Sequence, residues 1–362
     1  MSGGLGDPLR IVRRRLGVQR LTGGRCASPT EAVAWSGGVQ AQEHAEAIWS
    51  LGMRVDGCDA SGVQAACDRG EIIRTHVLRP TWHFVAAADL RWLLRLTGPR
   101  VLAKAAGRHR ELGLDDGTLA RCDELLADAC GDGDPRTRPE LAAALGAAGI
   151  DVAGQRMPHI LMHAELTGAI CSGPRRGKQH TYLALDGRIP AAPDRDRDDD
   201  VAELVLRYFV SHGPATLRDF AWWSGLTVVD GKAGLAIAGE RLVVEEDGAG
   251  GAWIAGADVP AGPPPCGDAF LLGTYDEMLV AYRDLRYVHA DGRVSAEFPT
   301  RSIVIDGRTV GSWRRVLSRR EVVVEVTLAT RLSADEHRAV KSAAERFGTF
   351  VALPARLKTT TA

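Results

Sequence analysis

The chain lacks the sequence features that mark a secreted, membrane-spanning or metal-binding protein. Its seven cysteines are odd in number and none forms a C-x-x-C pair, which argues against a zinc site or a disulfide framework. No apolar run approaches the roughly 18 residues of a membrane span. The first residues, MSGGLGDPLRIVRRRLG, have no long apolar core of the signal-peptide kind. We therefore expect a cytoplasmic protein with free thiols, no membrane contact and no metal.

Familiar catalytic signatures are missing as well. The chain holds no G-x-S-x-G, H-E-x-x-H or Walker loop. It also has no helix-hairpin-helix followed by a catalytic aspartate, which is the arrangement of one well-known class of DNA glycosylases. No cofactor is indicated by any of these patterns.

Charge is nearly balanced overall, with a net of −1, but it is unevenly distributed. Lys and Arg outnumber Asp and Glu by 16 to 9 in residues 1–110 and by 15 to 12 in residues 263–362. Acidic residues lead by 25 to 14 in residues 111–262. A polyanion would be attracted to the two positive ends, although a chance alternation of solvated faces is the alternative.

A similar order of elements recurs three times along the chain. In the first copy, SPTEAVAW begins with a capping box at Ser28 and Glu31, and more helices are expected within 43–52 and 60–68. The run EIIRTHVLRPTWHFV at 71–85 is rich in β-branched and aromatic residues, which predicts two strands. Helices followed by a hairpin are the pattern of a winged helix-turn-helix unit.

The C-terminal part has a different pattern. Residues 268–330 are mostly strand-like, and SADEHRAVKSAAERFG forms a capped closing helix that ends at Gly348. The predicted fold class is therefore α+β, with three tandem winged helix-turn-helix units followed by a β-rich C-terminal domain. The linker AAPDRDRDDD and the proline-rich AGADVPAGPPPCG mark two of the boundaries. The predicted segments are 1–110, 111–197, 198–262 and 263–362.

Two glutamines, Gln40 and Gln42, are the first candidates for chemistry. The glycines before them favour a non-helical backbone, and in an extended segment residues two apart share one face. Both amides could then hold one water. Glutamine is a poor base, but it can orient water near a developing positive charge. On the residues alone, two solvated loop side chains are the more common alternative.

The segment RPTWHFVAAADLRWLLRLTGPRV at 79–101 interleaves arginines with aromatic residues, a mixture that suits a nucleic-acid surface. Trp82 and His83 are candidates to line a site. A histidine between apolar neighbours is more often part of the core, so this alternative stays open for His83.

The segment LLGTYDEMLVAYRDLR at 271–286 is the third candidate. It places Tyr275, Asp276 and Glu277 side by side before an apolar run. Adjacent carboxylates can be an acid and a base, but without partners placed by geometry they are more often turn and cap residues.

Four segments together resemble one family, the bacterial AlkZ-like winged-helix DNA glycosylases, which includes enzymes that unhook interstrand crosslinks. The resembling segments are GGVQAQ at 37–42, the run at 79–101, MPHILMHAELTGAIC at 157–171 and the run at 271–286. They occur in the family's order and span most of the chain.

The resemblance implies three winged-helix units on a β-rich scaffold, with a concave, positively charged DNA channel. It also implies a catalytic element of Gln, an aliphatic residue, and then Gln or Asp. Gln40, Ala41 and Gln42 fit the Gln-x-Gln form, which resembles the branch associated with crosslink unhooking and with self-resistance to DNA-alkylating natural products. In GTYDEMLVAY the chain departs from many relatives, which have a proline and a phenylalanine before the Asp.

The resulting hypothesis is a monomeric DNA glycosylase that hydrolyses the N-glycosidic bond of N7-alkylated purines in double-stranded DNA, including crosslinked purines, and leaves abasic sites. Gln40 and Gln42 would position the water. A monofunctional reaction is expected because the lysine nearest to them in sequence is Lys104. We expect phosphate contacts from eight basic side chains. These are Arg13, Arg14, Arg15, Arg79, Arg100, Arg175, Arg176 and Lys178.

Three alternatives remain open at this point. One is a non-catalytic winged-helix regulator that only binds DNA. Another is a glycosylase that acts on monoadducts but not on crosslinks. If the glutamines proved dispensable for excision, Glu43 or Asp276 would be the base.

Overall fold

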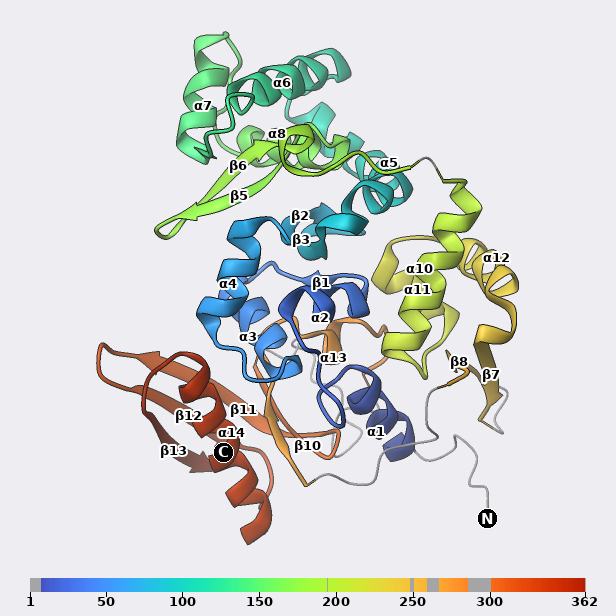
Figure 1. Cartoon of the computed structure of the whole chain (residues 1–362), viewed down its shortest axis with the longest axis vertical. Coiled ribbons are helices and arrows are strands. Elements are labelled where there is room, and N and C mark those ends of the chain that lie inside the picture. The colour runs from blue at the N-terminus through green and yellow to red at the C-terminus, as the bar shows by residue number, and fades with distance from the viewer. Residues whose placement is uncertain (1–7, 194, 248–250, 259–266, 286–300, 362) are drawn as a thin grey trace.

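The computed structural model describes residues 8–193, 195–247, 251–258, 267–285 and 301–361. It is a mixed α/β structure (Figure 1). The helices are α1 (Pro8–Val18), α2 (Pro29–Ser36), α3 (His44–Arg54), α4 (Ala60–Arg69), α5 (Ala87–Glu111), α6 (Asp116–Ala129), α7 (Arg138–Ala147), α8 (Arg156–Thr167), α9 (Leu185–Arg188), α10 (Arg197–His212), α11 (Leu217–Ser224), α12 (Val228–Ala238), the 3-10 turn η1 (Gly239–Arg241), α13 (Glu277–Val280) and α14 (Ala334–Phe350). The strands are β1 (Val39–Gln40), β2 (Ile72–Val77), β3 (Arg79–Ala86), β4 (Arg136–Thr137), β5 (Ile170–Arg176), β6 (Gln179–Ala184), β7 (Leu242–Glu246), β8 (Ala252–Gly256), β9 (Ala269–Leu271), β10 (Ser302–Ile305), β11 (Arg308–Leu317), β12 (Val322–Leu328) and β13 (Ala355–Thr361).

Local sequence sets several helix ends as predicted. Ser28 caps α2 by accepting from the Glu31 backbone N–H, and Gly37 ends the helix in the left-handed region at φ 71°. Ser333 and Glu336 form a capping box at the start of α14. That helix continues two residues past the predicted end at Gly348.

The predicted order of helices followed by a hairpin is present three times. In the first copy it runs α2–β1–α3–α4–β2–β3, and the short β1 pairs with β3 to give the sheet order β1-β3-β2. The second copy repeats this as α6–β4–α7–α8–β5–β6, with the order β4-β6-β5. In the third copy, α10–α11–α12–β7–β8, a single bridge between Ala215 and Ile254 stands where the others have a third strand.

The C-terminal part forms a five-stranded sheet in the order β13-β12-β11-β10-β9, with α14 packed against it. The predicted strand-like runs are β10, β11 and β12. Strand β13 was not predicted; it pairs in parallel with β12 after the chain has passed through α14.

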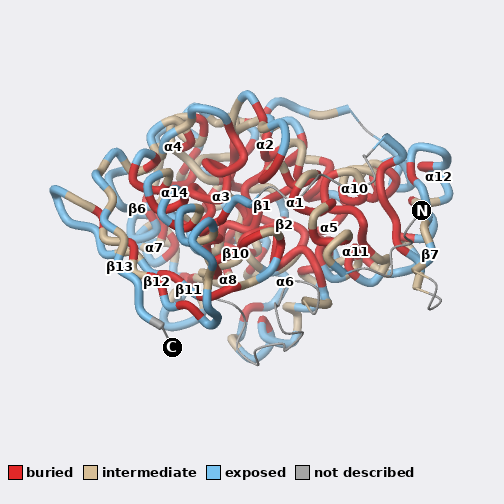
Figure 2. Tube along the Cα trace, turned by 90° about the horizontal axis from the view of Figure 1, so that it is seen from below, coloured by how far each residue is buried: buried red, intermediate tan, exposed pale blue. Residues whose placement is uncertain are grey.

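The hydrophobic cores join parts of the chain that are far apart in sequence. One core combines the first copy with the C-terminal sheet, for example Phe84 with Leu271 and Phe347. A second joins the β2–β3 hairpin and α5 to the third copy. The second copy has a core of its own, formed by side chains of residues 112–184. Buried residues therefore run through the middle of the molecule (Figure 2).

The two predicted linkers differ in the structure. The segment AAPDRDRDDD is only partly a linker, because α10 begins at Arg197. Asp200 in its first turn is buried, with Arg195 at 3.2 Å and Arg95 at 3.4 Å. The proline-rich boundary before the C-terminal part falls largely on residues 259–266, which lie outside the described residues.

Within the described ranges, no helix has both the length and the apolar character that crossing a membrane would need.

Candidate active site

Gln40 lies in the short strand β1, directly opposite His83 of β3. The predicted extended backbone is present at this position. Gln42 lies in a bend just beyond the strand and is half-buried, whereas Gln40 is only 8% exposed. Both glutamines therefore sit at the edge of the β1-β3-β2 sheet, between α2 and α3.

Hydrogen bonds fix Gln40 on two sides. Its backbone N–H donates to Glu277 Oε1 at 2.7 Å, and its side-chain Oε1 accepts from Arg79 Nη2 at 2.8 Å. Arg79 is the first residue of β3, so a neighbouring strand of the same sheet holds the amide.

The next two residues are held by β2 and β3. The Ala41 N–H donates to Trp82 O at 2.7 Å, and Gln42 Oε1 accepts a long bond of 3.5 Å from the Trp82 N–H. Arg74 donates to the carbonyls of Ala41 and Gln42 at 2.9 and 3.4 Å, and its guanidinium lies 4.4 Å from the Trp82 ring centroid. The Gln-x-Gln segment is thus preorganised by contacts that do not depend on substrate.

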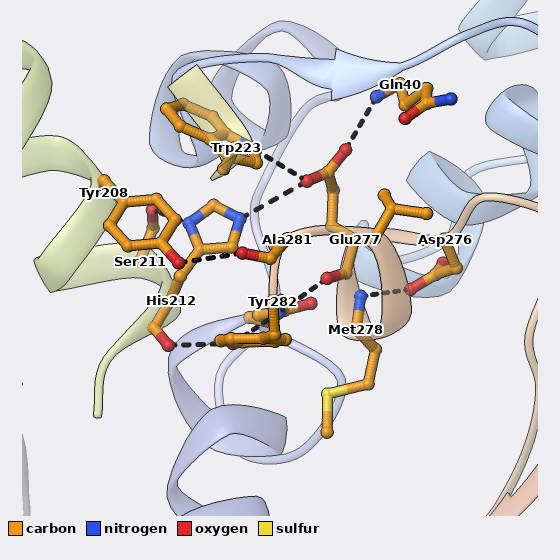
Figure 3. Close-up of polar contacts among 12 residues, drawn as sticks. Gln40, Tyr208, Ser211, His212, Trp223, Asp276, Glu277, Met278, Ala281 and Tyr282 are labelled. Carbon is orange, nitrogen blue, oxygen red and sulfur yellow. Dashed lines mark hydrogen bonds and ion pairs between the residues drawn. The ribbon is translucent and has the colours of Figure 1, made fainter. Parts of the chain in front are cut away.

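Glu277 is buried and links three parts of the chain (Figure 3). One carboxylate oxygen accepts from Gln40 N–H, and the other accepts from Trp223 Nε1 at 3.0 Å and lies 3.6 Å from His212 Nε2. Glu277 therefore fastens β1 to α10 and α11, and a further role for it in lining the site stays a prediction.

Asp276 is buried as well, and each of its oxygens has two donors. Oδ1 accepts from Arg54 Nη2 at 2.8 Å and from Met278 N–H at 2.9 Å, while Oδ2 accepts from Arg54 Nη1 at 2.9 Å and Ser50 Oγ at 2.6 Å. Burial alone would raise the pKa of Asp276, but Arg54 and these donors lower it below its usual value. A carboxylate this saturated has no lone pair free for a water, so Asp276 is removed as a candidate base.

The remaining candidates from the sequence fall in different surroundings. His83 is fully buried on the strand opposite Gln40, where burial and Arg79 lower its pKa well below its usual value. Its Nδ1 lies 2.9 Å from Thr81 O, so the core alternative applies and the site-lining prediction is corrected. Trp82 is half-buried against Gln42. Tyr275 is half-buried in a turn at φ 65°.

Two of the predicted phosphate contacts are buried and are corrected. Arg14 is 3% exposed and pairs with Glu245 at 2.6 Å, and Arg15 is 1% exposed. Arg15 donates to Pro214 O at 3.0 Å and places its guanidinium 3.6 Å from the Tyr282 ring centroid. Consecutive arginines look like a surface patch in sequence, but here α1 is packed against the third copy.

The other predicted contacts remain candidates. Arg13 is half-buried and paired with Asp306, and the exposed Arg100 donates to Gly225 O at 2.7 Å. The basic residues of the β5–β6 hairpin stand at its tip, which projects beside α4 in Figure 1. They are the half-buried Arg175 and the exposed Arg176 and Lys178.

A cluster of basic groups beside Gln42 was not predicted from the sequence. His44, the first residue of α3, has its ring 5.2 Å from His180 of β6, and its Nδ1 lies 3.4 Å from Arg175 Nη1. Burial, reinforced by Arg175, lowers the pKa of His44 to about 3. Burial and Arg74 lower that of His180 to about 4. The alternation in IIRTHV could have placed Arg74 on the face of β2 near Trp82, but the approach of β6 from the second copy has no local sequence signal.

We expect this cluster to make folding stability fall with acid. Both histidines are neutral in the folded chain, whereas in the unfolded chain they bind protons below about pH 6.5. The stabilisation contributed by the two neutral histidines is therefore complete above about pH 6.5, and it is lost progressively as the pH drops toward 4. Urea unfolding at pH 7.5, 5.5 and 4.5 measures the loss, and His44→Gln should reduce its slope. An unchanged slope in this variant would contradict the assignment.

Among the residues that the structure describes, no three His, Cys, Asp or Glu side chains come together as metal ligands would.

The similarity to known proteins extends over all the residues of the candidate site. A sequence model of the family described as DNA glycosylase AlkZ-like matches residues 33–350. Among solved structures, the chain is similar to Streptomyces sahachiroi DNA glycosylase AlkZ, with a TM-score of 0.81 and 22% identity over 98% of this chain and 99% of that chain. No curated protein matches. The structural likeness shows the fold, and the family match includes Gln40, Gln42 and Glu277.

Proposed function

The chain belongs to the AlkZ-like DNA glycosylase family, and from this premise we propose that it hydrolyses the N-glycosidic bond of N7-alkylated purines in duplex DNA. Family membership supports a DNA glycosylase; the lesion is our proposal. The observation that carries it is the Gln-x-Gln segment, which leads from strand β1 into a bend at the sheet edge and is held by Arg79, Arg74 and Glu277.

The proposed chemistry needs little base strength. Alkylation at N7 makes the purine cationic, so the C1′–N9 bond breaks with its electron pair leaving on the base and neutralising that charge. Water adds to C1′, and its proton passes to solvent. Amide dipoles suffice to hold the water beside an oxocarbenium-like sugar. The two nearby carboxylates, Asp276 and Glu277, are already occupied by structural donors.

We further propose that the reaction is monofunctional and that two events on opposite strands release an interstrand crosslink. No lysine follows or precedes the Gln-x-Gln segment closely; Lys104 lies on α5. The three repeated units would be winged helices around a DNA channel, with the β5–β6 hairpin as a wing that contacts phosphates.

A base-release assay tests this function. Duplexes carry either one N7-methylguanine or one N7–N7 guanine crosslink, and products are resolved with and without a heat step that cleaves abasic sites. Release of free base, with strand cleavage only after heating, supports a monofunctional glycosylase. Unhooking of the crosslinked duplex would extend the proposed activity to interstrand crosslinks. Tight duplex binding with no release from either substrate would instead indicate a non-catalytic DNA-binding protein.

The wing assignment gives a separate prediction. Lys178→Ala should weaken duplex binding to all sequences alike and reduce the slope of log K against log salt by about one, because one phosphate contact is lost. Fluorescence anisotropy from 50 to 300 mM salt measures this. Lys341→Ala on α14, whose ammonium faces Glu345, is the matched control. Equal slopes for Lys178→Ala and wild type would exclude the contact.

A further inference from the structure

We propose that Arg79 is a positioning residue that fixes the polarity of the Gln40 amide, so that Gln40 donates a hydrogen bond to the catalytic water while Gln42 accepts one from it. This inference rests on the proposed function and assigns the two glutamines different roles.

Arg79 Nη2 donates a hydrogen bond of 2.8 Å to the Gln40 amide oxygen. A guanidinium carries only donors and has no acceptor at any pH that a protein survives. The opposite amide orientation would bring the NH₂ group against an N–H of a cation, with two donors facing each other. The Gln40 oxygen must therefore face Arg79, and the nitrogen must point away from it.

The nitrogen is the free end of this side chain. Gln40 Nε2 bonds to none of the residues that the structure describes, and it keeps access to solvent although Gln40 is only 8% exposed. Gln42 differs, because its Oε1 holds one long bond of 3.5 Å from the Trp82 N–H and keeps acceptor capacity. The segment thus offers a fixed donor at one end and an acceptor at the other.

Arg79 itself is held in place by its surroundings. It follows Leu78, whose backbone has φ 63° and whose N–H donates to Thr97 Oγ1 at 3.0 Å. Gly225 approaches the same turn so closely that a Cβ there would lie 2.3 Å from Leu78 O. Burial lowers the pKa of Arg79, but arginine starts high enough to stay charged. The backbone that carries Arg79 is thus fixed before substrate arrives, and the guanidinium donates to Gln40 Oε1.

These roles satisfy all four bonding positions of the water. One lone pair attacks C1′ and the other accepts from Gln40 Nε2–H. One hydrogen points to Gln42 Oε1 and the second toward solvent. When the C1′–O bond forms, the proton leaves through the solvent-facing hydrogen, and both glutamines end in the state in which they began.

Variants of Arg79 test the proposal against its main rival, a phosphate contact. Arg79→Gln lets the Gln40 amide adopt either orientation, so the single-turnover rate of base release should fall by up to about 100-fold with an unchanged Kd and salt slope. Arg79→Lys keeps a cation that only donates and should recover most of the rate. Thermal melting checks that each variant folds.

The glutamines are then compared directly. Gln40→Glu removes the donor, whereas Gln42→Glu keeps an acceptor, so Gln42→Glu should release base at least about tenfold faster than Gln40→Glu. A reversed order, or an Arg79→Gln variant with the wild-type rate and a salt slope reduced by about one, would overturn the proposal. An inactive wild type that still binds duplex DNA would remove the proposed function itself, and this inference with it.

Discussion

Gln40→Ala and Gln42→Ala are each expected to slow base release by about 100- to 1,000-fold without weakening duplex binding. Each removes one of the two groups that hold the water, and the buried carboxylates nearby cannot replace it. Single-turnover assays on an N7-methylguanine duplex measure the rate, and anisotropy measures the affinity.

The two variants should differ in stability. Gln40→Ala leaves Arg79 Nη2 without its acceptor, which costs about 1.5–3 kcal/mol for a bond to a charged group. Gln42→Ala loses only the long bond from Trp82. Gln155→Ala is the control, since this exposed glutamine precedes α8 and makes no side-chain cap bond. If both Gln40→Ala and Gln42→Ala excise at the wild-type rate, the exposed Glu43 becomes the base to test.

Asp276→Ala is expected to lower the free energy of unfolding by about 3–5 kcal/mol. The change leaves the Arg54 guanidinium buried without its carboxylate, and it removes the side-chain cap of α13 together with the partner of Ser50. Urea unfolding followed by circular dichroism measures the difference.

A surface pair provides the control for this prediction. Glu345→Ala breaks an exposed contact with Lys341 and should cost at most about 0.5 kcal/mol. The folded fraction of the Asp276→Ala variant at low temperature should still release base. The reason is that Asp276 stabilises the fold through Arg54 and does not touch the substrate. Loss of excision in fully folded Asp276→Ala protein would return this residue to the list of catalytic candidates.

Much of the local structure was predictable because its causes lie within a few residues. Ser28, Glu31 and Gly37 determine where α2 begins and ends, and the glycines before Gln40 favour the extended backbone that it adopts. The strands β10 to β12 follow from β-branched runs separated by turns.

The errors concern residues whose partners are distant in sequence. Asp276 and Glu277 resembled an acid–base pair, yet their partners Arg54 and Gln40 lie 222 and 237 positions away and make them structural. Arg14 and Arg15 resembled a phosphate-binding patch in the sequence, but in the structure they are buried and bond to Glu245 and to Pro214 O. No local pattern encodes such contacts, because they depend on how whole elements pack.

The shared core between the first copy and the C-terminal sheet also constrains the order in which the protein can fold. Trp49 packs edge-on against Phe347 and donates to Leu271 O, and both partners are synthesised at least 222 residues later. During translation we therefore expect the packing around Gln40 to stay incomplete until Phe347 has left the ribosome. We expect residues 112–184, whose side chains form a separate core, to fold first.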